Sequence, residues 1–105
     1  MDLNIVVLCG TIMTDATVEY FDSGNQSGRL LMSIKQTEPR HRVDVIPVTF
    51  WRDDIGCDQF DRIIQQSKKG KRVWVAAQLQ RRFFGDTGTT RSGISIIASS
   101  VEVRE

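Results

Sequence analysis

The stretch from Lys71 to Phe84, KRVWVAAQLQRRFF, constrains the possible fold more than any other part of the sequence. Apolar residues recur at every second position, which is the period of a strand with one buried face. The buried set is Val73, Val75, Ala77 and Leu79, and the opposite set is Trp74, Gln78, Gln80 and Arg82. The stretch therefore predicts a long strand in a sheet with one face open to solvent.

This strand ends in two arginines followed by two phenylalanines, Arg81 to Phe84, and a Gly-Asp-Thr-Gly turn comes next. Guanidinium groups beside exposed aromatic rings form a surface that can hold phosphate and stack a base. The net charge is only +1, from 14 Lys and Arg against 13 Asp and Glu, but the charge is segregated. Seven basic residues lie between Lys68 and Arg91 with only Asp86 opposing them, so this half is suited to attract a polyanion.

Turn residues divide much of the remaining sequence into four further predicted strands. Strands are predicted at 3–13, 29–37, 43–51 and 89–104, and the first of these is apolar on both faces, as in a strand that is central or packed on a partner subunit. Gly10 predicts a bulge or strong bend in it. A change of phase between Ala98 and Val101 predicts a bulge in the last strand.

One amphipathic helix is predicted between the third and fourth strands. Phe60, Ile63 and Ile64 recur at helical spacing, and Asp53 or Asp54 is expected to cap the helix start. Gly70 is expected to end the helix. Three strands, a helix and two strands are the order of the OB-fold, a five-stranded, partly open Greek-key barrel, so we expect an all-β domain with one helix over residues 1–105.

Several classes of function are disfavoured by what the sequence lacks. Cys9, Cys57 and the single histidine, His41, make neither a disulfide framework nor a zinc ligand set. We find no nucleophile–base–orienter set and no Walker pattern, so no enzyme, cofactor or metal is expected. No apolar run reaches the roughly 20 residues of a membrane span, and a cytosolic (cytoplasmic) protein is expected.

Four short patterns occur in a fixed order around the predicted helix. They are Asn4-x-x-x-Leu8-x-Gly10, Val48-Thr49-Phe50-Trp51, Lys69-Gly70-x-x-Val73-x-Val75 and Gln78-Leu79-x-x-Arg82. Together they resemble the bacterial single-stranded DNA-binding protein family, over about residues 3–104. The resemblance implies sequence-tolerant, non-enzymatic binding of single-stranded DNA in replication, repair and recombination. It also implies a homotetramer or homodimer formed partly through Leu3 to Cys9, and replication or repair proteins as further partners.

The resemblance places base-stacking residues at Trp51 and Phe84, but the aromatic set is reduced. Two positions where many members carry tryptophan are occupied here by Pro39 or its neighbours and by Val45, so Phe83 or Trp74 would have to substitute. The DNA-binding residues expected from all these arguments are Trp51, Trp74, Phe83 and Phe84 for stacking, and Lys35, Arg40, Arg42, Arg52, Arg81, Arg82 and Arg91 for phosphate.

An alternative belongs to another class, a protein-interaction module that resembles primosomal replication protein N, a dimeric adaptor with this fold in replication restart. Family members commonly end in a glycine-rich linker and an acidic tail that recruits other proteins, whereas this sequence stops at Glu105. Either the sequence is shortened or the protein does not recruit partners in that way. The absent tail and the reduced aromatic set lend some support to the adaptor, but coating of single-stranded DNA stays the first hypothesis.

Overall fold

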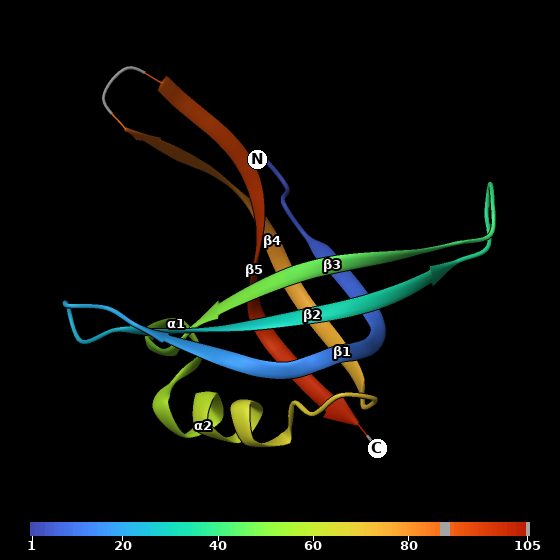
Figure 1. Cartoon of the computed structure of the whole chain (residues 1–105), viewed down its shortest axis with the longest axis horizontal. Coiled ribbons are helices and arrows are strands. Elements are labelled where there is room, and N and C mark those ends of the chain that lie inside the picture. The colour runs from blue at the N-terminus through green and yellow to red at the C-terminus, as the bar shows by residue number, and fades with distance from the viewer. Residues whose placement is uncertain (87–88, 105) are drawn as a thin grey trace.

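The computed structural model describes the backbone of residues 1–86 and 89–104, and the side chains of residues 1–81 and 93–104. Its elements are β1 (Val6–Tyr20), β2 (Gln26–Gln36), β3 (Arg42–Trp51), α1 (Arg52–Ile55), α2 (Cys57–Gln66), β4 (Arg72–Asp86) and β5 (Thr89–Arg104). The described strands form a closed barrel in the order β1-β2-β3-β5-β4. Figure 1 shows the strands coiling around one another, with α2 alongside. The predicted OB-fold, with its helix between the third and fourth strands, is confirmed.

Strand β1 pairs first with β4 and then with β2, and this change of partner closes the five-stranded sheet into a barrel. Val6 to Thr11 pair with β4, and Thr11 to Tyr20 pair with β2. Gly10 lies at this change, where an added Cβ would sit 2.3 Å from the carbonyl oxygen of Ser33. The register shifts of β1 come after Ile12, so Gly10 does not form a bulge. Its missing side chain instead lets β1 and β2 approach closely.

Strand β4 buries its apolar set only where the barrel encloses it. Val73 and Val75 are at most 1% exposed, whereas Leu79 is 43% exposed, so the prediction of a buried Leu79 is wrong. The β4–β5 hairpin continues beyond the barrel, as Figure 1 shows, so alternation alone does not ensure burial along the whole of β4. The side chain of Asn4 bonds both backbone groups of Leu79, accepting from its N–H at 2.9 Å and donating to its carbonyl at 2.7 Å.

The helical segment differs from the prediction in its start and its end. Gly56, with φ of +102°, separates α1 from α2. Strand β3 runs directly into α1, so Trp51 occupies the N-cap position with no side-chain cap, and Asp53 and Asp54 lie inside the first turn. The prediction of an aspartate cap is therefore wrong. Helix α2 ends at Gln66, before Gly70.

The core lies between α2 and the inner faces of the strands. Phe60 of α2 packs on Phe50 of β3 with ring centroids 5.4 Å apart. Gly28 of β2 faces Phe50 so closely that an added Cβ would lie 2.2 Å from the ring. The predicted bulge in β5 is confirmed, because the β4–β5 register shifts between the pairs Ala76–Ser100 and Ala77–Ala98, which leaves Ser99 unpaired.

Candidate nucleic-acid interface

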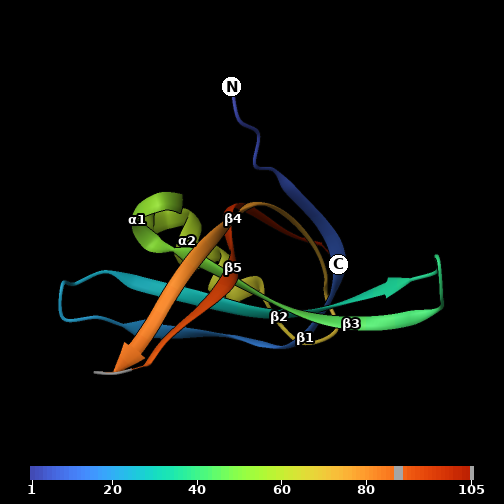
Figure 2. The same cartoon turned by 90° about the horizontal axis from the view of Figure 1, so that it is seen from above.

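Strands β1, β2 and β3 lie side by side (Figures 1 and 2). Their pairing register aligns residues in rows across the sheet. Ser27 of β2 pairs with Glu19 of β1 on one side and with Trp51 of β3 on the other. The next row consists of Arg29, between Thr17 and Thr49. Because Gly28 and Phe50 are buried, strand alternation puts these two rows on the outer face of the barrel.

A hollow of about 210 Å³ opens on this outer face, and we call it the Trp51 hollow. Its lining residues are Thr17, Glu19, Phe21, Ser27, Arg29, Thr49 and Trp51. The rings of Phe21 and Trp51 lie 5.3 Å apart at an interplanar angle of 41°. Trp51 is half-buried, whereas Phe50 is fully buried, which agrees with the opposite phase of the two residues in the sequence. The hollow therefore combines aromatic surface, hydroxyl groups, a cation and a carboxylate.

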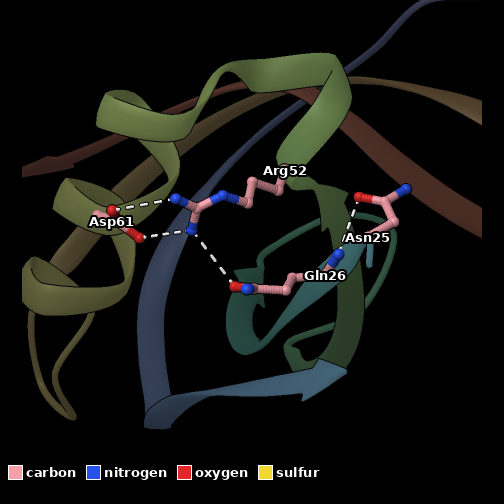
Figure 3. Close-up of polar contacts among 4 residues, drawn as sticks. All are labelled: Asn25, Gln26, Arg52 and Asp61. Atoms are coloured by element: carbon pink, nitrogen blue, oxygen red, sulfur yellow. Dashed lines mark hydrogen bonds and ion pairs between the residues drawn. The ribbon is translucent and has the colours of Figure 1, made fainter. Parts of the chain in front are cut away.

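Arg52 is engaged within the protein. Its guanidinium pairs with Asp61 of α2 at 2.8 Å and donates to the side-chain oxygen of Gln26 at 3.3 Å (Figure 3). It also lies 5.6 Å from the ring centroid of Phe60. The hydrogen bond to Asp61 raises the pKa of Arg52. These contacts tie α2 to the edge of the Trp51 hollow, so a phosphate at Arg52 would compete with Asp61.

Three basic residues lie toward the opposite end of the β2–β3 pair. Lys35 and Arg40 are exposed and make no ion pair with other described residues. Arg42 pairs with Asp44, donating from Nε at 3.0 Å, while Gln36 donates to the other oxygen of the same carboxylate at 2.6 Å. The bond from Arg42, and then that from Gln36, lowers the pKa of Asp44. Lys35 and Arg40 thus keep their charges available to a ligand.

The expected residues at the end of β4 fall largely outside what is described. The side chains of Arg82, Phe83, Phe84 and Arg91 lie outside the described residues. The backbone places Phe84 opposite Arg91 in the β4–β5 ladder. Arg81 is exposed and makes a contact within the protein. The structure therefore locates this hairpin but does not position its rings against Trp51.

Trp74 lies on a different part of the surface. It pairs with Cys9 of β1 and Glu102 of β5, and it lines a shallow depression with Val7, Ala76 and Ser100. We call this surface the Trp74 face. It shares no lining residue with the Trp51 hollow. The structure therefore does not bring Trp74 together with Trp51.

The N-terminal part of the chain continues the Trp74 face as an apolar edge. Leu3, Ile5 and Val7 are 79%, 66% and 64% exposed, although Val6 and Leu8 pack toward the core. Leu3 and Ile5 precede β1 and Val7 lies at its start, and such a row of exposed large apolar side chains is typical of a surface that meets another protein.

Of the six lining residues of the Trp51 hollow that were not expected from the sequence to contribute to binding, three carry a charge or an aromatic ring: Glu19, Phe21 and Arg29. They come from two strands and the loop after β1, and only the register brings them to Trp51. The one sequence signal for Arg29 is the alternation along residues 29–35. It puts Arg29 on the strand face opposite to that of the buried Leu30.

The described residues also bear on metal binding and on membrane crossing. They contain no group of three or more His, Cys, Asp or Glu side chains arranged to hold a metal ion. Among them, no helix has both the length and the apolar character needed to cross a membrane.

Comparison with known proteins agrees with this fold. The single-strand binding protein family matches residues 3–104. The single-stranded DNA-binding protein of Treponema pallidum is 29% identical over 102 residues, which cover 97% of this chain and 58% of that protein. Single-stranded DNA-binding protein 1 of Nostoc sp. is 27% identical over 105 residues, covering 98% and 84% of the two chains. This chain thus spans little more than half of the first relative.

A solved structure described as a Plasmodium falciparum SSB complex with ssDNA has the same fold, with a TM-score of 0.76 and 17% identity. It covers all of this chain, and 97% of its own length is matched. The family match over nearly the whole sequence, together with the observed barrel, shows that the chain belongs to the single-strand binding protein family.

Proposed function

We propose that this protein binds single-stranded DNA without catalysis, as one cytoplasmic domain acting in replication, repair and recombination. The strand would cross the outer face of β1–β2–β3, where OB-folds bind oligonucleotides. One observation carries the proposal: Trp51 and Phe21 line an open hollow beside Arg29, which has no ion-pair partner among the described residues. Stacking on such rings tolerates any sequence because every base has a π-face.

The phosphate path is proposed to run along β2 toward the β2–β3 hairpin. Arg29 and Lys35 lie six residues apart on the same face of β2, about 20 Å at the rise of a strand. Arg40 follows in the hairpin, and Arg42 and Arg52 would join after leaving their carboxylates. We keep Arg81, Arg82, Phe83, Phe84 and Arg91 as contacts from the β4–β5 hairpin.

Self-association is the second part of the proposal. The exposed side chains of Leu3, Ile5 and Val7 would pair with a second copy, and Trp74 would lie at this contact instead of on the DNA path. Burying each of these three side chains in the contact would stabilise the association by about 1.5–3 kcal/mol, because apolar surface is removed from water. A homodimer is the expected unit, and a homotetramer would be two such units.

A fluorescence titration with oligo-dT at several salt concentrations tests DNA binding. We expect quenching of tryptophan emission and an affinity that falls with salt, at a logarithmic slope of about −0.7 for each phosphate contact. Neither quenching nor salt dependence at any concentration would remove the basis for the proposal.

The adaptor function remains the second candidate, and one observation favours it. Val43 and Val45, which continue the face of Trp51 along β3, are 59% and 50% exposed and aliphatic. They offer apolar surface to a protein but no ring for a base. Light scattering with and without a long oligo-dT separates the candidates. A mass that stays dimeric with micromolar or weaker DNA binding fits the adaptor, and tight binding with a complex containing several subunits fits the coat.

A further inference from the structure

Glu19 is unexpected in a hollow proposed to bind a polyanion. Its carboxylate is exposed on the same outer face as Trp51 and lines the same hollow. It makes no ion pair with Arg29 or with any other described residue. A carboxylate repels phosphate, but it accepts hydrogen bonds from the amino and imino groups on base edges. Its position suits recognition of a base edge better than contact with the backbone.

The row Glu19–Ser27–Trp51 gives that carboxylate a definite relation to a stacked base. The outer strands of three are about 10 Å apart, and Ser27, the small residue between them, is only 7% exposed and forms the floor. A base stacked on the open part of the Trp51 ring would extend over Ser27 toward Glu19, because the three residues form one row across the sheet. Phe21 bounds one side of this position, and Arg29 of the next row bounds the other.

Guanine is the one base that can make two hydrogen bonds with each of the two charged residues. Its N1–H and amino group are adjacent donors for the two oxygens of a carboxylate, and its O6 and N7 accept from an arginine. Cytosine and adenine offer a single amino group, and thymine offers only one ring N–H between two carbonyl oxygens. The remaining polar lining, the hydroxyls of Thr17 and Thr49, accommodates any base.

We propose that the Trp51 hollow is a base-selective subsite that prefers guanine, read by Glu19 and Arg29, within an otherwise sequence-tolerant DNA path. The proposal rests on the proposed function, because it names the ligand of the same site. A volume of about 210 Å³, below the 300–1,000 Å³ usual for drug-sized ligands, fits a single base.

The test compares a fluorescently labelled dT12 with the same oligonucleotide carrying one central dG, dI, dC or dA, by anisotropy at fixed salt. Good bidentate contacts discriminate by about 1–3 kcal/mol, and for an exposed site we expect the lower end, so the dG strand should bind about fivefold tighter than dT12. Inosine, which lacks the 2-amino group, should bind between the two. Equal affinities for all five strands would overturn the subsite while leaving DNA binding intact, and no binding to any strand would instead overturn the proposed function.

The variant Glu19→Gln removes the preference through the proposed contact. A glutamine keeps the size of the side chain but presents one acceptor and one donor, so the dG advantage should disappear, and affinity for dT12 should rise because a negative charge is lost from the DNA path. The matched control is Glu102→Gln on the Trp74 face, which should keep the fivefold preference. A Glu19→Gln protein that still prefers dG, or a Glu102→Gln protein that loses the preference, would overturn the assignment.

Discussion

The two tryptophans of this chain are both accessible on the outside of the barrel, yet their surroundings differ in kind. Trp51 lies in a hollow beside Phe21, with Arg29 and Glu19 unpaired among the described residues. Trp74 lies on a shallow face, where Arg72 donates to Thr11 and Cys9 and Arg104 pairs with Glu102. This difference is the reason why we propose Trp51, and not Trp74, as the ring that stacks a base. The two tryptophan surfaces differ in whether the charged groups around the ring already have partners among the described residues.

The largest expected effect tests the apolar edge beside Trp74. Val7→Asp puts a carboxylate where we propose that a second copy packs, and burying an unpaired charge costs several kcal/mol. The dimer dissociation constant should rise more than a hundredfold, measured by analytical ultracentrifugation. Val43→Asp is the matched control on the other face and should leave the mass unchanged. An unchanged mass for Val7→Asp would show that this edge is not the contact.

Next in size is the loss of the stacking ring. Trp51→Ala should weaken oligo-dT binding by about 1–3 kcal/mol, measured by anisotropy of a labelled strand, because one stacked base loses its platform. Trp74→Ala should keep the affinity per subunit. If both variants lose affinity equally, the contrast between the two surfaces is wrong. Circular dichroism during thermal unfolding checks that Trp51→Ala still folds, as expected for a half-buried residue.

A smaller effect tests Arg29, the cation of the Trp51 hollow, which makes no ion pair among the described residues. With oligo-dT, which presents no guanine to engage Arg29, Arg29→Gln should lower the steepness of the logarithmic salt dependence by about 0.7, the contribution of one phosphate contact to single-strand binding. Arg72→Gln, on the side of Trp74, should leave the slope unchanged because its guanidinium is already bonded to Thr11 and Cys9. A slope that Arg29→Gln does not change would argue that Arg29 contacts only the base.

The smallest effect concerns the pH dependence of stability at the far end of the β2–β3 pair. The bond from Arg42 holds the pKa of Asp44 below its model-compound value of 3.8. A depressed folded-state pKa stabilises the protein above the unfolded-state value, and that contribution is lost as pH falls through the folded pKa. Urea unfolding from pH 6 to pH 3 should therefore show the wild type losing its small advantage over Asp44→Asn below about pH 4. A constant difference across this range would contradict the assignment.

Much of the fold could be predicted from strand periodicity. The alternation in 73–77 identified the buried face of β4, and the phase change after Ala98 located the bulge at Ser99. The helix boundaries could not be predicted, because nothing in the local sequence reveals that β3 enters α1 without a loop. Leu79 follows the same alternation as Val75, but alternation does not tell where the barrel stops covering the strand.

The site was less predictable because it depends on contacts between strands. Trp51 could be identified from its phase, but Glu19 and Arg29 reach it only through the pairing of β1 and β3 with β2. Arg52 looked like a cation available to phosphate, and only the position of α2 reveals its bond to Asp61. A sequence gives the side chains that a strand exposes, whereas their charge partners depend on how the strands and helices meet.

The bonds between Asn4 and the backbone of Leu79 have a consequence for assembly. The last ladder pair of β1 and β4 is Val6 with Ala77, and the amide of Asn4 takes the place of a missing strand neighbour two residues further out. A lone subunit thus already holds its leading segment against β4. Fixing a residue costs about 1–2 kcal/mol of conformational entropy. Because folding has already fixed this segment, the docking of a second subunit does not incur that cost again.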